Sequence, residues 1–384
     1  MPDDQGPGRL AAVRDALARL GEPWRAGETS LSRLPDEAIR ARLGVPPPRP
    51  DQLAARVGQP AAMAKAAIAA GAPRAAAPTA DSPPPAQPRR FDLRDVDGHD
   101  YVTPVRNQGR AGSCVAFGVV AAMESTARYT RGAPGLDLDL SEGHLYFVHA
   151  RARGYRVDTG SWPHEIFADA SDKGVAFEEC LPYVDDGSGA LAPDWADRLA
   201  RAVDVVDLTG SPARMKEHIR TRGPVTACMV VNKDFLYYTG GVYRATTEEF
   251  AGGHCVNVIG WDDDLGCWIG KNSWGVEWGE KGFFRIAYGE AYLEDYPDPR
   301  PTVHGCAAVS LRAWLPARRA LHLFTSADDD NGWAYLEHFG WTRLAGGPAA
   351  TGAKLTALAH ARASGHRVTA FVDGTELRDV LVHD

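Results

Sequence analysis

The stretch Arg-Asn-Gln-Gly-Arg-Ala-Gly-Ser-Cys-Val-Ala-Phe-Gly-Val-Val, residues 106–120, decides the fold. A loop of small and polar residues ends at Cys114, where an apolar run typical of a buried helix begins. Free cysteine is among the most buried residue types, so a cysteine in this place most often belongs to a core. At a helix N-terminus, however, the helix dipole and the free N–H groups lower the pKa of a thiol. The rest of the chain has to separate these two interpretations.

Composition and charge place the chain among soluble globular proteins. It has 384 residues, of which 44% are apolar and 24% are charged, enough for two or three domains. A formal net charge of −8 gives no reason to expect nucleic acid or an anionic membrane as a partner. No stretch approaches the roughly 18 apolar residues of a membrane span, and residues 1–24 lack an apolar signal-peptide core. These features predict a cytoplasmic protein, or one exported by a route other than Sec.

The six cysteines are spread along the chain without any Cys-x-x-Cys pair. This spacing argues against a zinc site and against a dense disulfide framework. The sequence therefore predicts neither a metal nor a cofactor. The cysteines are Cys114, Cys180, Cys228, Cys255, Cys267 and Cys306.

Residues 1–71 are predicted to form a small helical region, joined to the rest by a Pro/Ala-rich linker at 72–90. The expected helices in this region are 9–20, 31–44 and 54–71. Ser32 or Asp36 is the expected cap of the second helix, and the prolines that follow Gly44 must end it.

Residues 91–312 carry helices first and strands second, which predicts an α+β domain. The expected helices are 114–131, 140–152 and 162–174. The expected strands are 224–231, 240–245, 254–262, 267–274 and 282–288. Two subdomains of this kind leave a cleft between them, where an active site is expected.

Residues 318–384 have the order β-β-β-α-β-β, which matches a small OB-type barrel. The expected strands are 320–326, 332–337, 340–344, 366–374 and 375–383, with a helix at 354–365 that ends at a glycine. The tail also carries the aromatic residues Trp333, Tyr335, Phe339 and Trp341. Aromatic residues that alternate along strands usually fill a barrel core. Exposed, they would suit sugar stacking or a protein interface.

A thiolate nucleophile needs a base, a group that orients the base, and donors for the oxyanion. Residues of these types occur in a fixed order, as Gln108, Cys114, His254 and Asn272. Each alone says little, because the chain has twelve histidines and an asparagine before Ser-Trp-Gly is most often a turn residue.

Five spaced motifs make the pattern specific. They are NQGRAGSCVAFG (107–118), LSEGHLYF (140–147), GSWP (160–163), GHCVNVIGW (253–261) and KNSWGVEWGEKGFFRI (271–286). In this order they resemble the papain-like cysteine peptidases over residues 91–290. The resemblance implies a two-lobed fold, with a helical lobe, a β-barrel-like lobe and the active site in the cleft between them.

By this resemblance, Cys114 would be the nucleophile and His254 its partner in a thiolate–imidazolium pair. Asn272 would orient the imidazole, and Trp274 would keep water from that contact, although an ordinary core tryptophan fits the same position. Gln108 would donate its side-chain amide to the oxyanion, beside the backbone N–H of the nucleophile. The implied reaction is acyl transfer, in which the thiolate attacks a peptide carbonyl and water then hydrolyses the thioester.

Three positions depart from the family pattern. Ala111 stands where a second cysteine is usual, which removes a common disulfide and fits a reducing compartment. Val115 replaces an aromatic residue, and Gly253 stands where an acidic residue is frequent. Packing beside the thiolate and the pH profile are therefore expected to differ.

The resemblance also places substrate contacts. A turn whose backbone pairs with an extended peptide would be formed by Gly160, Ser161, Trp162 and Pro163. Cys228 and Cys255 would lie near the pocket for the second residue on the acyl side, where small walls suit a bulky apolar side chain. Alternatively, both are buried strand cysteines away from the substrate.

Members of this family are commonly made as zymogens, with a helical prosegment in the cleft. Residues from about Trp24 to Val45 are predicted to cover the cleft as an intramolecular inhibitor, with activation by a cut near Arg89-Arg90. The alternative is a flexible tether without an inhibitory role. An Ala/Arg/Pro-rich composition further associates the chain with a bacterial source.

The sequence thus predicts a cysteine endopeptidase that acts on peptide or protein substrates, made as a zymogen, with an accessory tail. Two alternatives stay open. A glycan- or protein-binding, toxin-like protein would use the papain fold as a scaffold, with its tail contacting glycans or further copies of the chain. A transamidase or ligase would pass the same thioester to an amine instead of water.

Overall fold

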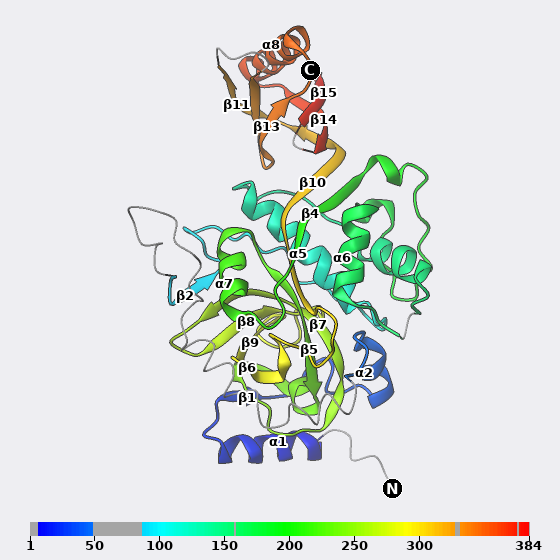
Figure 1. Ribbon diagram of the computed structural model, residues 1–384, viewed down its shortest axis with the longest axis vertical. Helices are drawn as coiled ribbons and strands as arrows, with labels where there is room; N and C mark the ends of the chain where they lie inside the picture. The colour runs from blue at the N-terminus through cyan, green and yellow to red at the C-terminus, as the bar shows by residue number, and fades with distance from the viewer. Residues whose placement is uncertain (1–6, 49–86, 157–158, 327–330, 375, 384) are drawn as a thin grey trace.

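The computed structural model describes residues 7–48, 87–156, 159–326, 331–374 and 376–383. Two lobes pack against the long helix α5 (Cys114–Thr130), and a smaller lobe extends beyond them at the C-terminal end (Figure 1). The expected α+β arrangement, with helices before strands, is confirmed for the two-lobed body.

The helical lobe is built around α5, which buries almost every side chain from Cys114 to Ala127 because its sequence is apolar nearly all round. Next come the π-helix η1 (His144–Ala150) and α6 (Pro163–Asp172). Proline suits the first position of α6, where a backbone N–H would have no helical partner. All three predicted helices are confirmed, although the middle of the second has π geometry.

The sheet lobe centres on β7 (Phe250–Asp262), which is buried along almost its whole length. Its neighbours are β5 (Val225–Asn232) and β8 (Cys267–Lys271), followed outward by β9 (Phe283–Ala287) and β6 (Tyr238–Tyr243). All five predicted strands are confirmed, and β7 begins at Phe250, before the predicted start at 254. The β5–β7 register sets Met229 opposite His254 and Cys228 opposite Cys255.

The sequence analysis did not identify several other elements of the body. The strands among them are β2 (Arg90–Asp92), β3 (Val175–Ala176) and β4 (Leu199–Asp207). The helices are α7 (Pro212–Thr221), η2 (Glu178–Cys180), η3 (Trp195–Asp197), η4 (Lys233–Tyr237) and η5 (Glu290–Tyr292). Most are short, so their sequence pattern is weak. β4 is long, but its neighbours in the sheet are distant in the chain.

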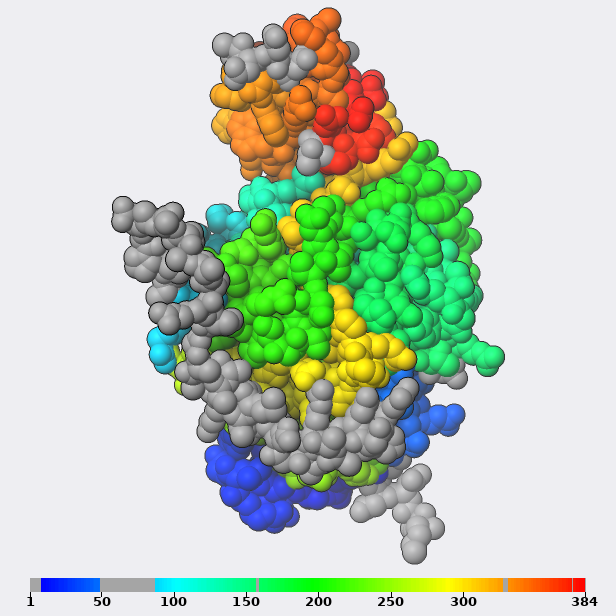
Figure 2. Space-filling view, viewed as in Figure 1, coloured from blue at the N-terminus to red at the C-terminus, as the bar shows by residue number. Residues whose placement is uncertain are grey.

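The N-terminal segment docks on the sheet lobe, where it forms the blue mass at the bottom of the molecule (Figure 2). It consists of α1 (Pro7–Arg19), β1 (Trp24–Ala26) and α2 (Asp36–Arg42). β1 adds an antiparallel strand beside β6, and the buried Trp24 indole donates to the Arg244 carbonyl at 2.8 Å. Asp36 forms ion pairs with Lys233 at 3.0 Å and Arg9 at 3.1 Å. Apolar burial and ion pairs therefore both hold the segment in place.

The second helix of this segment is shorter than predicted. α2 begins only at Asp36, after Pro35 in an extended conformation (φ −64°, ψ 150°), because proline disfavours a helical conformation in the residue before it. The predicted cap is wrong: Ser32 accepts the backbone N–H of Thr29 in the preceding turn, and α2 has no side-chain cap. The predicted helix at 54–71 and the linker up to residue 86 lie outside the described residues.

One long strand joins the C-terminal lobe to the body. β10 (Val303–Arg318) pairs with β4 through residues 304–312 and with β14 (Arg367–Gly374) through residues 311–318. The predicted boundary between residues 312 and 318 therefore falls inside a strand. In Figure 1, β10 runs from the body into the upper lobe.

The elements of the tail follow the predicted order. They are β11 (Ala320–Thr325), β12 (Gly332–Leu336), β13 (Gly340–Leu344), α8 (Pro348–Ser364), β14 and β15 (Glu376–His383). The helix ends at Gly365 in the left-handed conformation (φ 74°), as the glycine stop predicts. The strands pair in the order β10-β14-β15-β13-β12-β11.

Only part of the aromatic set in the tail fills the core. Phe339 is buried, whereas Trp333 and Tyr335 are half-buried and Trp341 is 47% exposed. The alternation along β12 and β13 points Ala334, Leu336 and Leu344 inward. The usual interpretation of alternating aromatics as core therefore holds for Phe339 and fails for Trp341.

Candidate active site

Three elements carry the predicted catalytic side chains. Cys114 begins α5, His254 lies in β7, and Asn272 directly follows β8. Nε2 of His254 donates to Oδ1 of Asn272 at 2.8 Å, because a carbonyl oxygen can only accept. The Trp274 ring stacks on the imidazole with centroids 4.5 Å apart and covers this contact. All four side chains are buried.

Gln108 points its side-chain amide at the N-terminal segment. Its Oε1 accepts the Ser273 hydroxyl at 2.7 Å. Its Nε2 donates to the carbonyl of Arg42 at 2.9 Å and to that of Ala111 at 2.8 Å. The Tyr183 hydroxyl donates to the Gln108 backbone carbonyl at 2.8 Å and fixes the loop. The amide that the resemblance assigns to the oxyanion is thus occupied by a carbonyl of the segment.

The chain after α2 crosses the cleft in an extended conformation. On one wall the N–H of Ser161 donates to the Gly44 carbonyl at 2.9 Å. On the other wall the N–H of Val45 donates to the Gly253 carbonyl at 3.1 Å. The Tyr296 hydroxyl donates to the carbonyl of the next residue, Pro46, at 2.9 Å. Both walls therefore bind the segment through its backbone, as in strand addition.

This approach requires glycine on both sides. A Cβ on Gly44 would lie 1.8 Å from the carbonyl oxygen of Gly112, and a Cβ on Gly160 would lie 2.0 Å from that of Gly44. Gly160 also has a φ of +68°, which favours glycine. The sulfur of Cys114 accepts the backbone N–H of Gly44, so the segment covers the sulfur directly.

Residues 87–296 match the family described as papain family cysteine protease. The chain belongs to the papain family of cysteine proteases. Cathepsin B-like CP3 of Giardia intestinalis is 35% identical over 211 residues, which make up 52% of this chain and 69% of that protein. Pro-cathepsin H of Mus musculus is 34% identical over 214 residues, 52% of this chain and 62% of that protein. These relatives are eukaryotic and do not support the expected bacterial source, which stays a prediction.

Solved structures share the fold of this papain-family chain. ProCathepsin B S9 from Trypanosoma congolense aligns with a TM-score of 0.58 at 19% identity, covering 77% of this chain and 97% of that one. Procathepsin L 3 from the Tenebrio molitor larval midgut aligns with a TM-score of 0.57 at 20% identity, covering 78% and 88%. At these identities the likeness establishes the papain-like α+β fold and nothing further.

Burial sets the protonation of the papain-family pair in the covered cleft. Desolvation raises the pKa of the Cys114 thiol far above its usual range, against the smaller opposing effect of the N–H groups that reach the sulfur. Desolvation also lowers the pKa of His254 to about 4, although the hydrogen bond to Asn272 opposes this shift. Burial therefore disfavours the expected thiolate–imidazolium pair in the covered chain, and the pair of the uncovered enzyme stays a prediction.

The predicted substrate-contact residues lie around the segment. Ser161 binds it directly, and the apolar cluster that contains Val45 and Cys114 also contains Trp162, Cys228 and Cys255. Pro163 is buried as the first residue of α6. Tyr296, which no sequence pattern singled out, is fully buried in the same cluster. Its sequence neighbourhood, Glu-Asp-Tyr-Pro-Asp-Pro, is typical of a turn, so no sequence pattern pointed to a buried ring.

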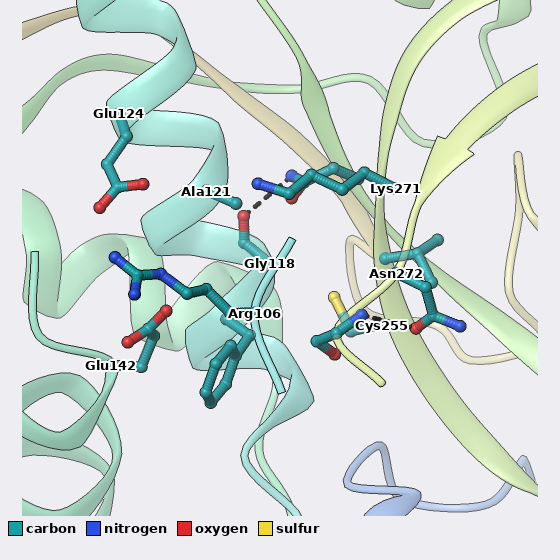
Figure 3. Close-up of a pocket in the computed structure, with 12 residues that line it drawn as sticks. Arg106, Gly118, Ala121, Glu124, Glu142, Cys255, Lys271 and Asn272 are labelled. Atoms are coloured by element: carbon teal, nitrogen blue, oxygen red, sulfur yellow. Dashed lines mark hydrogen bonds between the residues drawn. The ribbon is translucent and has the colours of Figure 1, made fainter. Parts of the chain in front are cut away.

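A second group that the sequence analysis missed lies behind the site, where charged side chains are buried between the lobes (Figure 3). Lys271, next to Asn272, donates to the Thr103 hydroxyl at 3.0 Å, and burial lowers its pKa to about 8. Burial raises the pKa of Glu124 on α5 to about 7 and that of Glu142 well above its usual range. A glutamate inside the apolar run of α5 was the available signal.

The part of the chain that the structure describes contains no group of three or more His, Cys, Asp or Glu side chains placed to hold a metal ion. Among its helices, none is both long and apolar enough to cross a membrane. The expectation that the chemistry needs no cofactor rests on the residue types and stays a prediction.

Proposed function

We propose that this papain-family chain is a cysteine endopeptidase made as an inactive precursor, with Cys114, His254, Asn272 and Gln108 as its catalytic residues. The observation that carries the proposal is the path of residues 42–46, whose backbone binds both cleft walls, the Gln108 amide and the Cys114 sulfur. A peptide substrate needs those same groups. The segment therefore competes with the substrate for every polar contact around the nucleophile.

In the uncovered enzyme, the Cys114 sulfur loses its proton to Nδ1 of His254. Among the described residues this nitrogen has no hydrogen-bond partner in the covered chain. The thiolate attacks the substrate carbonyl, and the Gln108 amide and the Cys114 N–H stabilise the oxyanion. The imidazolium then protonates the leaving amine, and water hydrolyses the thioester. Asn272 keeps the imidazole in orientation through the 2.8 Å hydrogen bond.

Replacing the nucleophile tests this assignment. We expect Cys114→Ala to abolish peptide cleavage and Gln108→Ala to lower kcat by about 10²–10³, the usual cost of one oxyanion donor. Cleavage is measured on a peptide library after the segment has been removed, with Cys267→Ala as the control because this buried cysteine of β8 lies outside the site. Full hydrolysis by Cys114→Ala would exclude the proposed nucleophile.

The same library reports the substrate class. We propose that Cys228, Cys255 and Tyr296 line the pocket for the second residue on the acyl side, with Trp162 on its other wall. The support is their shared apolar cluster with Val45, the segment residue that lies beside them. A pocket of this composition favours an apolar side chain. A cleavage profile without apolar preference at that position would reject the proposed pocket. If an amine is added and the products carry it, the transamidase alternative is favoured.

The close contact at Gly44 offers a test of inhibition without truncation. Gly44→Ala sets a methyl group 1.8 Å from the Gly112 carbonyl oxygen, and Gly44 has no left-handed φ that would confuse the effect. Overpacking costs about 1–3 kcal/mol, so we expect peptidase activity of the full chain to rise by about 5- to 100-fold. The matched control is Gly347→Ala, where a Cβ meets open space.

We expect the control to behave as wild type, and cleavage at Arg89 to bring all three chains to the same activity. If Gly44→Ala leaves the full chain as active as wild type, the segment is a tether and not an inhibitor.

We further propose that the tail is an OB-like barrel that binds glycans. The strand order supports the barrel. The sheet of the tail pairs in the order β10-β14-β15-β13-β12-β11, so β10 and β11 are its two end strands. These two end strands are neighbours in the chain, separated only by Arg319. Rings from three adjacent strands support the binding surface: Tyr335 contacts Trp341 at 5.5 Å and His322 at 5.7 Å between centroids. Trp341 is 47% exposed and can stack on a sugar.

A glycan array checks this surface. We expect the full chain to bind at least one glycan class and Trp341→Ala to lose at least about tenfold in affinity, the scale of an exposed aromatic contact. Trp314→Ala on β10, a similarly exposed tryptophan that packs on Phe371, is the control. An array without signal, together with a monomer in sedimentation, would exclude both glycan binding and self-association. An array without signal but with an oligomer in sedimentation would favour self-association.

A further inference from the structure

A pair of cysteine thiols lies under the cleft. Cys255 follows His254 in β7, and Cys228 is its opposed residue on β5. Opposed residues of antiparallel strands have Cα atoms about 4.5–5.5 Å apart, which lies within the range that a disulfide spans. The Cys255 thiol is hydrogen-bonded to Cys228, and both thiols are free and buried. The pair can therefore close into a disulfide with little movement of either strand.

The third thiol of this cluster is Cys114. Its sulfur accepts the backbone N–H of Cys255, so the side chain of Cys255 begins beside it. The Cys255 sulfur packs on α5, where a Cβ on Gly118 would lie 3.2 Å from it. Gly118 is one helical turn beyond Cys114 on the same face of α5. Figure 3 draws Cys255 beside the helix that carries Gly118. The order of the three thiols is therefore Cys114, Cys255, Cys228.

We propose that Cys255 and Cys228 form a thiol relay that returns an oxidised Cys114 to its reduced state. This rests on the proposed function, because it needs a reactive thiolate at Cys114. A hydroperoxide oxidises that thiolate to a sulfenic acid and is reduced to water or an alcohol. The Cys255 thiol then attacks the sulfenic sulfur. A Cys114–Cys255 disulfide forms, and the thiol proton leaves with the hydroxide as water.

The last step is thiol–disulfide exchange. The Cys228 thiol attacks the Cys255 sulfur, the Cys228–Cys255 disulfide forms, and Cys114 leaves with the proton as a free thiol. With hydrogen peroxide the net reaction consumes one peroxide and two thiols, and it yields one disulfide and two water molecules. An external dithiol resets the pair. Oxidation thus moves from the nucleophile to two cysteines that take no part in bond cleavage.

The relay is closed while the N-terminal segment is in place. Gly44 donates to the Cys114 sulfur, and Val45 packs in the same apolar cluster as all three thiols. Desolvation there also raises the pKa of the Cys255 thiol, which keeps it protonated and unreactive. Peroxide is therefore expected to reach the thiols only after the cleft is uncovered.

The experiment uses the full chain, folded and then cleaved at Arg89 to free the segment. One sample is treated with an epoxide, and labelling of Cys114 checks the proposed nucleophile. A second sample receives one equivalent of hydrogen peroxide, and its cysteines are mapped by mass spectrometry while activity is followed relative to each variant's own starting value. The variants are Cys255→Ala, Cys228→Ser and, as the matched control, Cys267→Ser, whose buried thiol lies outside this cluster.

We expect wild type and Cys267→Ser to form the Cys228–Cys255 disulfide. In Cys255→Ala, Cys114 should instead be oxidised to the sulfinic acid. Wild type and Cys267→Ser should therefore lose activity about tenfold more slowly than Cys255→Ala. Cys228→Ser should accumulate the Cys114–Cys255 disulfide, with activity restored by dithiothreitol. Sulfinic acid at Cys114 in wild type, at the rate seen in Cys255→Ala, would overturn the relay. Failure of the epoxide to label Cys114 would instead overturn the proposed nucleophile. The uncleaved chain should remain reduced in the same time.

Discussion

Removal from water favours the neutral forms of a thiol and an imidazole, and the covered cleft depends on this constraint. The described groups around Cys114 and His254 are backbone N–H groups, an amide and aromatic rings. None of these carries a charge that would offset the desolvation of a thiolate–imidazolium pair. In the proposed precursor, the segment would therefore act in two ways, because it occupies the path of an extended peptide and burial disfavours the charged pair.

The segment can lie in the cleft because its backbone polar groups find partners there. A buried N–H or carbonyl without a hydrogen bond costs about 1–3 kcal/mol. Ser161 and Gly253 supply a donor and an acceptor from opposite walls. The Gln108 amide and the Tyr296 hydroxyl take two further carbonyls. Under the proposed function, the same groups would bind an extended substrate in place of the segment.

The sequence was most informative where chemistry restricts the residue types. Cys114, His254, Asn272 and Gln108 occur in spaced motifs, and the structure joins His254 to Asn272 and sets the same N-terminal segment against Gln108 and Cys114. It was less informative where long-range packing decides. Nothing local indicated that β10 would run through both lobes, because its partners β4 and β14 lie about a hundred and about fifty residues away. α2 is shorter than its apolar spacing predicts, because Pro35 keeps the residue before it out of a helical conformation.

Gly44 could not have been recognised from the sequence, because its role comes from the wall it faces. Gly112 and Gly160 line that wall, Gly253 lies on the opposite wall, and all three allow a backbone to approach closely. A side chain at any of the three would block the segment and a substrate alike, so these positions cannot separate inhibition from catalysis. Gly44 belongs to the segment alone. In the proposed function, the physical distinction between precursor and enzyme therefore lies in the segment, and the cleft that binds it also binds the substrate.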